Sequence, residues 1–426
     1  MSKSTPKRSS AGNGPHSLTP KGARTRKSLL QAAQRVFGAH GYSGASVSQI
    51  SRECGLGQGT FYQYFRNKDQ VFREVVDEAL SDFWSQANAL ALEGLSPHDA
   101  LRQVLLLLLS HCREYAPIHR VLNEFDIIET VTISYYDSIA WFFRDFHRRM
   151  VNMGQFRSLD PNVVAYSMLG MAIFEQRPWE DLGPKHSLED LAELCARFLE
   201  SGISGPKNWQ PPEQWISSFP APAQEGPLPW GEGDSPGKAT KIAIFQAAEQ
   251  VLGEMGYAGA GISDITRQAG VAQGTFYVHF KSKQDLMNGV VRFLSHLLRR
   301  ELRRATNRHQ DRRDKEVQGM LSFFNFLGRH SLIYRIVAES EAIVPEAAEY
   351  YYNKLAGGYA ASLAVSIEDR EIRDLPLEIM VPALMGIHHM IGLRWLVWST
   401  SPLPDIPKQL IDDAVSLVLF GLAGRS

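Results

Sequence analysis

The feature that most limits how this chain can fold is an internal repeat. Shifting the sequence by 215 positions lays Gln31–Phe72 on Gln246–Met287 without a gap, and about half of the paired residues are identical. The stretch QGTFY occurs at 58–62 and again at 273–277, and the same offset pairs Glu124 with Glu339 further along. We therefore expect one folding unit used twice, followed each time by a more diverged companion domain.

The rest of the chain is divided by composition. The N-terminus is basic and rich in Ser, Pro and Gly, which predicts a disordered tail, and the stretch between the copies holds eight prolines, which predicts an extended linker. The expected order is a basic tail at 1–20, a DNA-binding-type unit at 21–72, a companion domain at 73–202, a linker at 203–237, a second unit at 238–287 and a second companion domain at 288–426.

Hydrophobic spacing predicts an all-α protein. Strand signals are almost absent, whereas apolar residues recur at helical spacing in segment after segment. Near the start of each copy, Leu29, Ala33 and Phe37, and likewise Ile244, Ala248 and Leu252, form one apolar stripe that ends at a glycine-rich break. The expected fold is a tandem duplication of a three-helix unit and a helical companion domain.

Composition excludes several classes of protein. Three cysteines lie far apart and form no CxxC pair, which argues against a disulfide framework or a zinc ribbon. No apolar run approaches the roughly 18–20 residues of a membrane-spanning helix. The net charge of -1 argues against a protein that coats nucleic acid by bulk positive charge. We expect a soluble protein of the cytoplasm, associated with the nucleoid, with no membrane partner.

A helix-turn-helix pattern follows the first helix. Ser46 is suited to cap a short helix, Gly55 ends it, and Phe61 and Phe65 stand at i and i+4 on a second short helix predicted from about 58 to 65. Burying these two phenylalanines turns the intervening polar residues outward. Two tyrosines among them, Tyr62 and Tyr64, are then exposed on one short helix.

That outward face suits DNA. In a major groove, glutamine side chains can hydrogen-bond base edges, and a glycine lets the backbone approach closely. Hydroxyls and a lysine can bond phosphates and fix the register. The predicted base-reading residues are Gln58, Gly59 and Gln63, and the predicted phosphate contacts are Ser46, Thr60, Tyr62, Tyr64 and Lys68.

Here the chain resembles the tetracycline-repressor (TetR) family of bacterial transcriptional regulators. The segments VSQISRECGLGQGTFYQYFRNKDQVF and ISDITRQAGVAQGTFYVHFKSKQDLM are similar to that family's DNA-binding segment. The resemblance implies a double-stranded DNA operator as partner and ligand-binding and dimerisation roles for the companion domains. It also implies the matching DNA roles in the second copy for Gln273, Gly274, Thr275, Tyr277, Val278, His279 and Lys283.

The copies differ where bases would be read. Val278 stands in place of Gln63; it can touch a thymine methyl but cannot make the hydrogen bonds of a glutamine. Two unlike half-sites, and hence an asymmetric operator, are expected. A second copy kept only as a scaffold stays an alternative. The linker favours an intramolecular pseudo-dimer, and association into a further homodimer stays open.

The companion domains suggest a ligand. Their aromatic and Met-rich segments are more often core packing, yet the resemblance implies a pocket for an apolar or aromatic inducer, such as an aromatic compound, a fatty-acyl thioester or a steroid. Candidate lining residues are Phe125, Tyr135, Trp141, Met171 and Phe174 in the first copy and Phe326, Tyr350, His388 and Trp395 in the second.

The expected mechanism is repression relieved when the inducer binds. No nucleophile elbow, phosphate-binding loop or metal-ligand spacing is present, so no catalytic residue, metal or cofactor is expected. Adjacent His388 and His389 point about 100° apart on a helix and do not suggest a metal site. The alternatives are an activator, or an adaptor with vestigial helix-turn-helix units.

Overall fold

The structure is a computed structural model that describes residues 19–122, 124, 131–180, 182–183, 186–211, 235–399 and 405–423. Within these ranges the regular elements are helices, and the only β-type contacts are two isolated bridges, Phe156–Ala423 and Ser204–Ile372. The all-α prediction is confirmed.

The helices fall into two series of the same order, which we call the first half (α1–α9) and the second half (α10–α18). The first half consists of α1 (Pro20–Gly44), α2 (Val47–Glu53), α3 (Gln58–Phe61), α4 (Lys68–Ala89), α5 (Pro97–Glu114), α6 (Ala116–Val121), α7 (Ile133–Asn152), α8 (Pro161–Glu175) and α9 (Leu188–Ser201).

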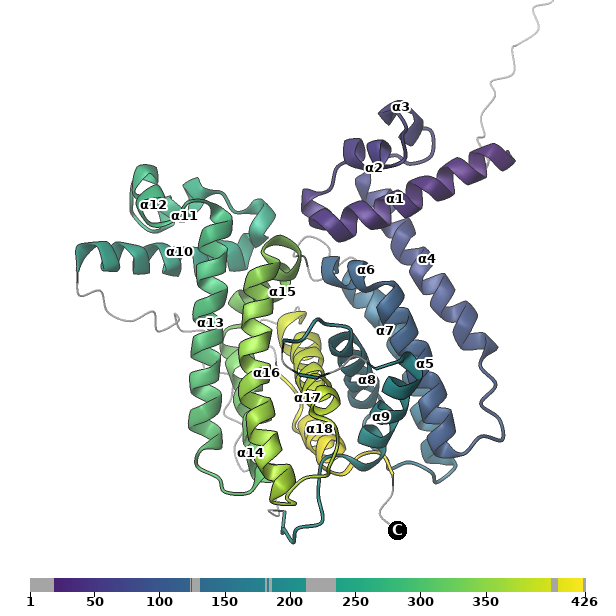
Figure 1. Cartoon of the computed structure of the whole chain (residues 1–426). Helices are drawn as coiled ribbons and strands as arrows, with labels where there is room; N and C mark the ends of the chain where they lie inside the picture. The colour runs from purple at the N-terminus through teal and green to yellow at the C-terminus, as the bar shows by residue number, and fades with distance from the viewer. Residues whose placement is uncertain are drawn as a thin grey trace, which may run out of the picture.

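The second half consists of α10 (Pro236–Gly259), α11 (Ile262–Gln268), α12 (Gln273–His279), α13 (Lys283–Thr306), α14 (Arg312–Arg329), α15 (Ser331–Ile343), α16 (Pro345–Glu368), α17 (Leu377–Gly392) and α18 (Lys408–Phe420), with a π-helical turn η3 (Leu393–Val397) after α17. The three N-terminal helices of each half lie at the same end of the molecule, and the long helices α4, α13 and α16 run away from them (Figure 1).

Local sequence sets where many of these helices begin. Asn67 accepts a hydrogen bond from the amide of Gln70 at 2.8 Å and starts α4, and Ser282 does the same for α13 through Asp285 at 3.1 Å. Such N-caps satisfy amides that have no partner inside the helix. The helix predicted from about 58 to 65 is shorter than expected. Its regular α-helical part, α3, ends at Phe61, and the chain continues to Phe65 in tight turns.

The two halves meet where α8 crosses α17 near the centre of the molecule (Figure 1). A Cβ atom added to Gly170 would lie 2.1 Å from the carbonyl oxygen of Gly386, and one added to Gly386 would lie 2.2 Å from that of Gly170. The two backbones are therefore in direct contact. Leu377–Val397 is long and apolar enough to cross a membrane by length and composition, but 83% of its most apolar 18-residue window is buried inside the protein, as in a core helix.

The ends of α9 and α18 also interlock. The amide of Leu422 donates to the carbonyl oxygen of Leu199 at 2.7 Å, and the amide of Ile203 donates to that of Val418 at 2.9 Å. The segment predicted as a linker begins with residues that pack on the second half: Gly205 donates to Glu371 and Lys207 to Arg370. The remainder of that segment from 212 to 234, and the tail to residue 18, lie outside the described residues.

Candidate nucleic-acid interface

Each half builds its helix-turn-helix in the same way. Between α2 and α3, Gly55 has a φ of 67°, and Gly270 has a φ of 66° at the matching turn between α11 and α12. Glycine adopts this left-handed conformation at little cost. The next residue closes each turn, because Leu56 donates to the carbonyl of Ser51 at 2.9 Å and Val271 to that of Thr266 at 3.0 Å.

The recognition helices, α3 and α12, bury one face and expose the other. Phe61, Phe65, Phe276 and Phe280 are buried, as their spacing predicts. As a result, most of the residues predicted to contact DNA are exposed: Gln58, Gly59, Tyr62, Gln63, Gln273, Gly274, Tyr277 and Val278. Tyr62 is 57% exposed, Tyr277 54% and Val278 78%. Large apolar or aromatic surfaces left in water on one short helix indicate a contact surface.

Space around the two recognition glycines fits the predicted close approach. A Cβ atom added to Gly59 or Gly274 would meet nothing within 4 Å. The protein itself therefore does not require glycine for packing at these positions, and the open backbone is accessible to a partner.

Other predicted contacts are less exposed. Thr60, Thr275 and His279 are half-buried, and Tyr64 is half-buried against the core of the helix-turn-helix, because the turn that follows Phe61 rotates it inward. Ser46 is exposed and caps α2 by accepting from the amide of Gln49 at 3.2 Å. In the second half, where Gly261 lacks a hydroxyl, the carboxylate of Asp264 accepts from the Gly261 amide at 3.0 Å.

The two predicted phosphate-binding lysines are engaged inside the protein. The ammonium group of Lys68 donates to the carbonyl oxygen of Tyr42 at 2.7 Å and lies 4.4 Å from the centre of its ring. Lys283 donates to the carbonyl oxygens of Tyr257 and Ala260 at 2.5 and 2.7 Å, and its burial lowers its pKa. Both lysines hold the turn at the kink near the end of the first helix of their half, where Gly41 and Gly256 depart from helical geometry.

In each half, a carboxylate of the companion domain accepts hydrogen bonds from the same turn. Glu124, which is 1% exposed, accepts from the amides of Tyr42 and Ser43 at 2.5 and 2.9 Å. Glu339 in α15 accepts from the amide of Tyr257 at 3.1 and 3.0 Å. Burial raises the pKa of Glu124, and the backbone amides oppose that rise. We call this arrangement the turn clamp; it joins each DNA-binding unit to its companion domain.

Sequence reasoning missed the role of the turn clamp, although a signal existed. Glu124 and Glu339 match at the 215-residue offset in a region where only a few other pairs, such as Arg120 and Arg335, are identical. Their function depends on contact with residues some 80 positions away, as in the Tyr42 and Tyr257 amides.

The structure also contains a cavity of about 290 Å³ inside the second half, bounded mainly by α13, α14, α16 and α17. We call it the second-half pocket. Of the predicted ligand-pocket residues, Phe174 and His388 line it. Burial lowers the pKa of His388, which lies 3.5 Å from the buried carboxylate of Glu316.

The other predicted pocket residues lie elsewhere. Trp141 was predicted wrongly: it is 54% exposed, because α7 turns its neighbours Phe142 and Phe143 inward. Tyr135, Met171 and Phe326 are fully buried core residues. Tyr350 lies under the guanidinium of Arg292, and Trp395 packs edge-on against Tyr166. Phe125 lies outside the described residues.

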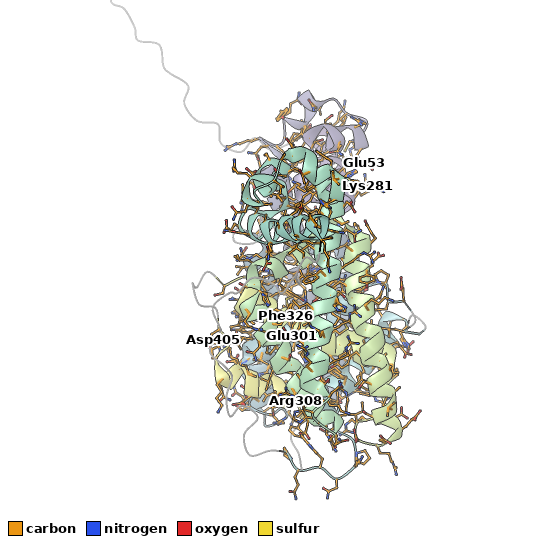
Figure 2. All side chains as sticks on the ribbon, turned by 90° about the vertical axis from the view of Figure 1, so that its left-hand side faces the viewer. Glu53, Lys281, Glu301, Arg308, Phe326 and Asp405 are labelled. Atoms are coloured by element: carbon orange, nitrogen blue, oxygen red, sulfur yellow. The ribbon has the colours of Figure 1, made fainter. Side chains whose placement is uncertain are left out.

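Figure 2 shows Glu53, which ends α2, and Lys281, which follows α12, at the same end of the molecule, with Arg308 toward the opposite end. Both helix-turn-helix units therefore lie at one end of the molecule.

Comparison with known proteins agrees with this geometry. The family model described as bacterial regulatory proteins, tetR family, matches residues 29–75 and 244–290. The chain is 23% identical over 184 residues to the helix-turn-helix transcriptional regulator YhgD of Bacillus subtilis. The aligned residues make up 42% of this chain and 96% of that protein. It is 32% identical over 82 residues to the transcriptional repressor NicS of Pseudomonas putida, which covers 19% of this chain and 39% of that protein.

The solved structures named here each match less than half of the chain. AibR, solved in complex with isovaleryl coenzyme A and operator DNA, is 18% identical with a TM-score of 0.34 and covers 40% of this chain and 95% of its own. The fatty acid degradation regulator FadR of Bacillus halodurans is 18% identical with a TM-score of 0.36 and covers 47% of this chain and all of its own.

Two family matches lie on two copies of the same helix-turn-helix, and the relatives named above are transcriptional regulators. Both helix-turn-helix units of the chain therefore belong to the TetR family of DNA-binding transcriptional regulators, and the polypeptide carries two of these units in tandem.

Proposed function

We propose that this regulator is a ligand-responsive repressor. Its two non-identical helix-turn-helix units bind one asymmetric operator as an intramolecular pair in the bacterial cytoplasm, and a largely apolar small molecule releases it. The single observation behind the proposal is the exposure of both recognition helices at one end of a chain whose halves are in backbone contact at Gly170 and Gly386.

The asymmetry of the operator follows from the recognition surfaces. Gln63 and Val278 occupy the same position in the two halves and both are exposed. A glutamine can hydrogen-bond an adenine, whereas a valine can only contact a methyl group. The two half-sites are therefore expected to differ at the base pairs that these residues face.

The second-half pocket is suited to the inducer. Its inner lining is apolar and includes Leu302, Met320, Phe323, Leu355 and Met385. Cationic side chains also border it: Arg299, Arg303, Lys315 and Lys354. This combination favours a ligand with an apolar body and an anionic end.

The pocket reaches the helices that hold the second DNA-binding unit. α13 contributes Leu298 and Leu302 to the pocket and begins with Lys283; α15 contributes Tyr334 and carries Glu339. A ligand that displaces either helix moves the second half's turn clamp and with it α12. Release requires that the ligand favour the displaced state by only a few kcal/mol.

The test uses an operator selected from random duplexes. We expect footprinting of the wild type to show a non-palindromic site. Thr60→Ala with Tyr62→Phe should lose protection on one half-site, and Thr275→Ala with Tyr277→Phe on the other. Each pair of changes removes predicted contacts to DNA phosphates, so the affinity for the operator should fall roughly 10- to 100-fold.

Trp141→Phe is the matched control, because it alters an exposed aromatic residue on α7, away from the recognition helices. It should leave the footprint and the affinity unchanged. A strictly palindromic best site would contradict the unlike half-sites, and unchanged binding by both double variants would contradict the proposed DNA surface.

A further inference from the structure

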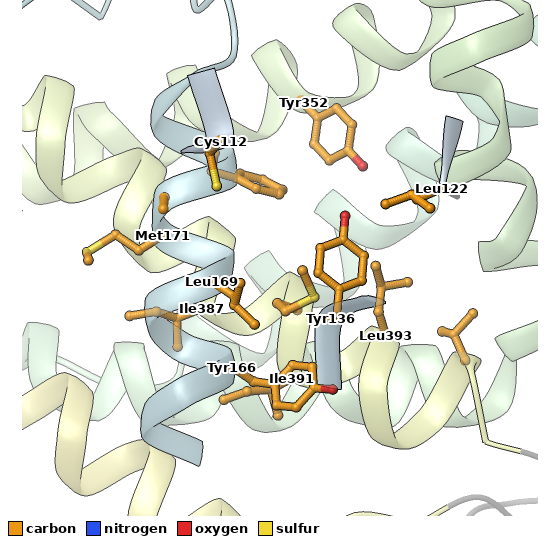
Figure 3. Packing of buried hydrophobic residues seen from close by; sticks show 14 of the residues in the cluster. Cys112, Leu122, Tyr136, Tyr166, Leu169, Met171, Tyr352, Ile387, Ile391 and Leu393 are labelled. Atoms are coloured by element: carbon orange, nitrogen blue, oxygen red, sulfur yellow. The ribbon is translucent and has the colours of Figure 1, made fainter. Parts of the chain in front are cut away.

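A second cavity, of about 300 Å³, lies between the two halves. We call it the seam cavity. Its walls come from α5 to α8 of the first half and from α15, α16, α17 and η3 of the second, so neither half forms it alone. Figure 3 shows Tyr136 of the first half and Tyr352 of the second in this region, with their hydroxyl groups toward each other.

The charged pair beside the cavity, Arg177 and Glu341, already has its hydrogen-bond partners within the protein. Arg177 of the first half lies 2.9 Å from Glu341 of the second, with the two side chains 16% and 7% exposed. Tyr352 donates to the other carboxylate oxygen of Glu341 at 3.0 Å, and its ring lies 3.9 Å from the Arg177 guanidinium. Because both oxygens of Glu341 have partners, this carboxylate offers little to a cationic ligand.

Two nitrogens on the lining lack partners among the described residues: Nε2 of His119 and Nε2 of Gln176. His119 is 5% exposed, and its Nδ1 lies 3.1 Å from the hydroxyl of Tyr136. Burial lowers the pKa of His119 to about 3, so its ring is neutral and carries one proton, on Nδ1 or on Nε2. In the tautomer with the proton on Nε2, Nδ1 accepts from the Tyr136 hydroxyl and Nε2 is a donor without an acceptor. The amide nitrogen of Gln176 is a second such donor, and a buried donor without an acceptor is costly.

Much of the remaining wall is apolar. Phe174 packs edge-on against Tyr352 with ring centres 5.5 Å apart, and Trp179, Ile173 and Met390 also line the cavity. At the exposed edge, Arg120 and Glu349 carry opposite charges. The volume is at the lower end of the range for small-molecule sites, which favours a single ring over a long chain.

We propose that the seam cavity is a second ligand site and that it takes a small aromatic carboxylate. The ring lies among Tyr136, Phe174 and Tyr352, and the carboxylate accepts hydrogen bonds from His119 and Gln176.

The seam cavity and the second-half pocket share lining residues, so a ligand in one can affect the other. Phe174, Tyr352 and His389 line both cavities and form a shared wall between them. A ligand that fixes this wall from one side changes the shape available on the other. Any effect on operator release rests on the proposed function, whereas binding to the seam cavity does not.

The test measures binding of trans-cinnamate to the full chain by isothermal titration calorimetry without DNA. We expect one seam site per chain, with cinnamyl alcohol at least about tenfold weaker because it lacks the charged acceptor. Gln176→Leu should weaken cinnamate about tenfold by removing a donor. Gln176→Glu should weaken cinnamate further by repulsion and leave cinnamyl alcohol unchanged, which separates loss of recognition from loss of folding.

Gly358→Leu is the control, since Gly358 lines the second-half pocket with open space around it. It should leave cinnamate binding unchanged. Absence of cinnamate binding, equal binding by the wild type and both Gln176 variants, or loss of binding only in Gly358→Leu would each overturn the proposal. Because no DNA is present, failure of operator binding would leave this result intact.

Discussion

At the scale of single residues, the turn clamp is the most informative contact. Gly41 has a φ of 72°, and this turn directs the next two amides at the carboxylate of Glu124. Hydrogen bonds from backbone amides to a buried carboxylate are stronger than those to a neutral group. The position of Glu124 therefore sets the position of the first DNA-binding unit.

Glu124→Gln should loosen this turn, because an amide presents a single, uncharged acceptor oxygen in place of two. Hydrogen exchange of the Tyr42 and Ser43 amides should accelerate roughly tenfold or more, which corresponds to about 1.5–3 kcal/mol for bonds to a charged group. Glu339→Gln is the matched variant and should affect the Tyr257 amide instead. If each change left its own amides equally protected, the clamp would have no energetic role.

At the scale of elements, the crossing of α8 and α17 depends on two glycines. Each Cβ position is filled by backbone atoms of the other helix, so there is no flexible side chain that can move aside. The crossing is the closest approach available to two helices, and it joins the halves through their backbones.

Gly386→Ala should therefore destabilise the protein by about 1–3 kcal/mol or more, as overpacking does, and lower the urea midpoint. Gly357→Ala is the control: Gly357 lies in α16 with nothing within 4 Å of its Cβ position. There the same change should stabilise by about 0.5–1 kcal/mol, because alanine favours helix. Equal effects of the two variants would contradict the close crossing.

At the scale of the whole molecule, interlocked halves should unfold together. Backbone hydrogen bonds at the ends of α9 and α18 and the ion pair between Arg177 and Glu341 both join one half to the other. Six histidines of the described residues, three in each half, are buried, and burial lowers the pKa of all six, His147 and His388 among them. Burial lowers the pKa of His111 and His330 to about 4 and that of His119 and His389 to about 3.

These histidines should make the protein sensitive to acid. The unfolded chain binds protons below about pH 6.5, while the folded chain does not until pH falls to about 3–4. The contribution of these histidines to the free energy of unfolding is therefore fully present above about pH 6.5. Below that pH it decreases by on the order of 1 kcal/mol per histidine per pH unit. His98 acts in the opposite direction, because Glu200 and Glu193 raise its pKa, but it is partly exposed and its effect is small.

Urea unfolding between about pH 7.5 and 5.5, followed by circular dichroism and tryptophan fluorescence, checks both expectations. The two signals should coincide in one transition whose midpoint falls with pH. His111→Gln, which cannot be protonated, should flatten the slope by about the share of one histidine. A midpoint independent of pH, or two separate transitions, would contradict these expectations.

Much of the candidate DNA interface could be predicted from the sequence, because its determinants are local. Phe61 and Phe65 are four residues apart, so helical periodicity alone turns Gln58, Tyr62 and Gln63 outward. The end of α3 was missed, since Tyr64 is drawn inward by a turn whose geometry depends on packing. The lysines at the start of α4 and α13 were assigned to phosphates, whereas contact with the preceding turn engages them within the protein.

By itself, the sequence determined the duplication, the helical class and the two helix-turn-helix units, because identity, periodicity and capping act within short stretches of chain. Only the tertiary structure decided that Trp141 faces solvent, that Gly170 meets Gly386, and that cavities form inside the second half and along the seam. The glycine crossing and the seam cavity join residues more than 200 positions apart, and their contacts depend on how whole helices pack.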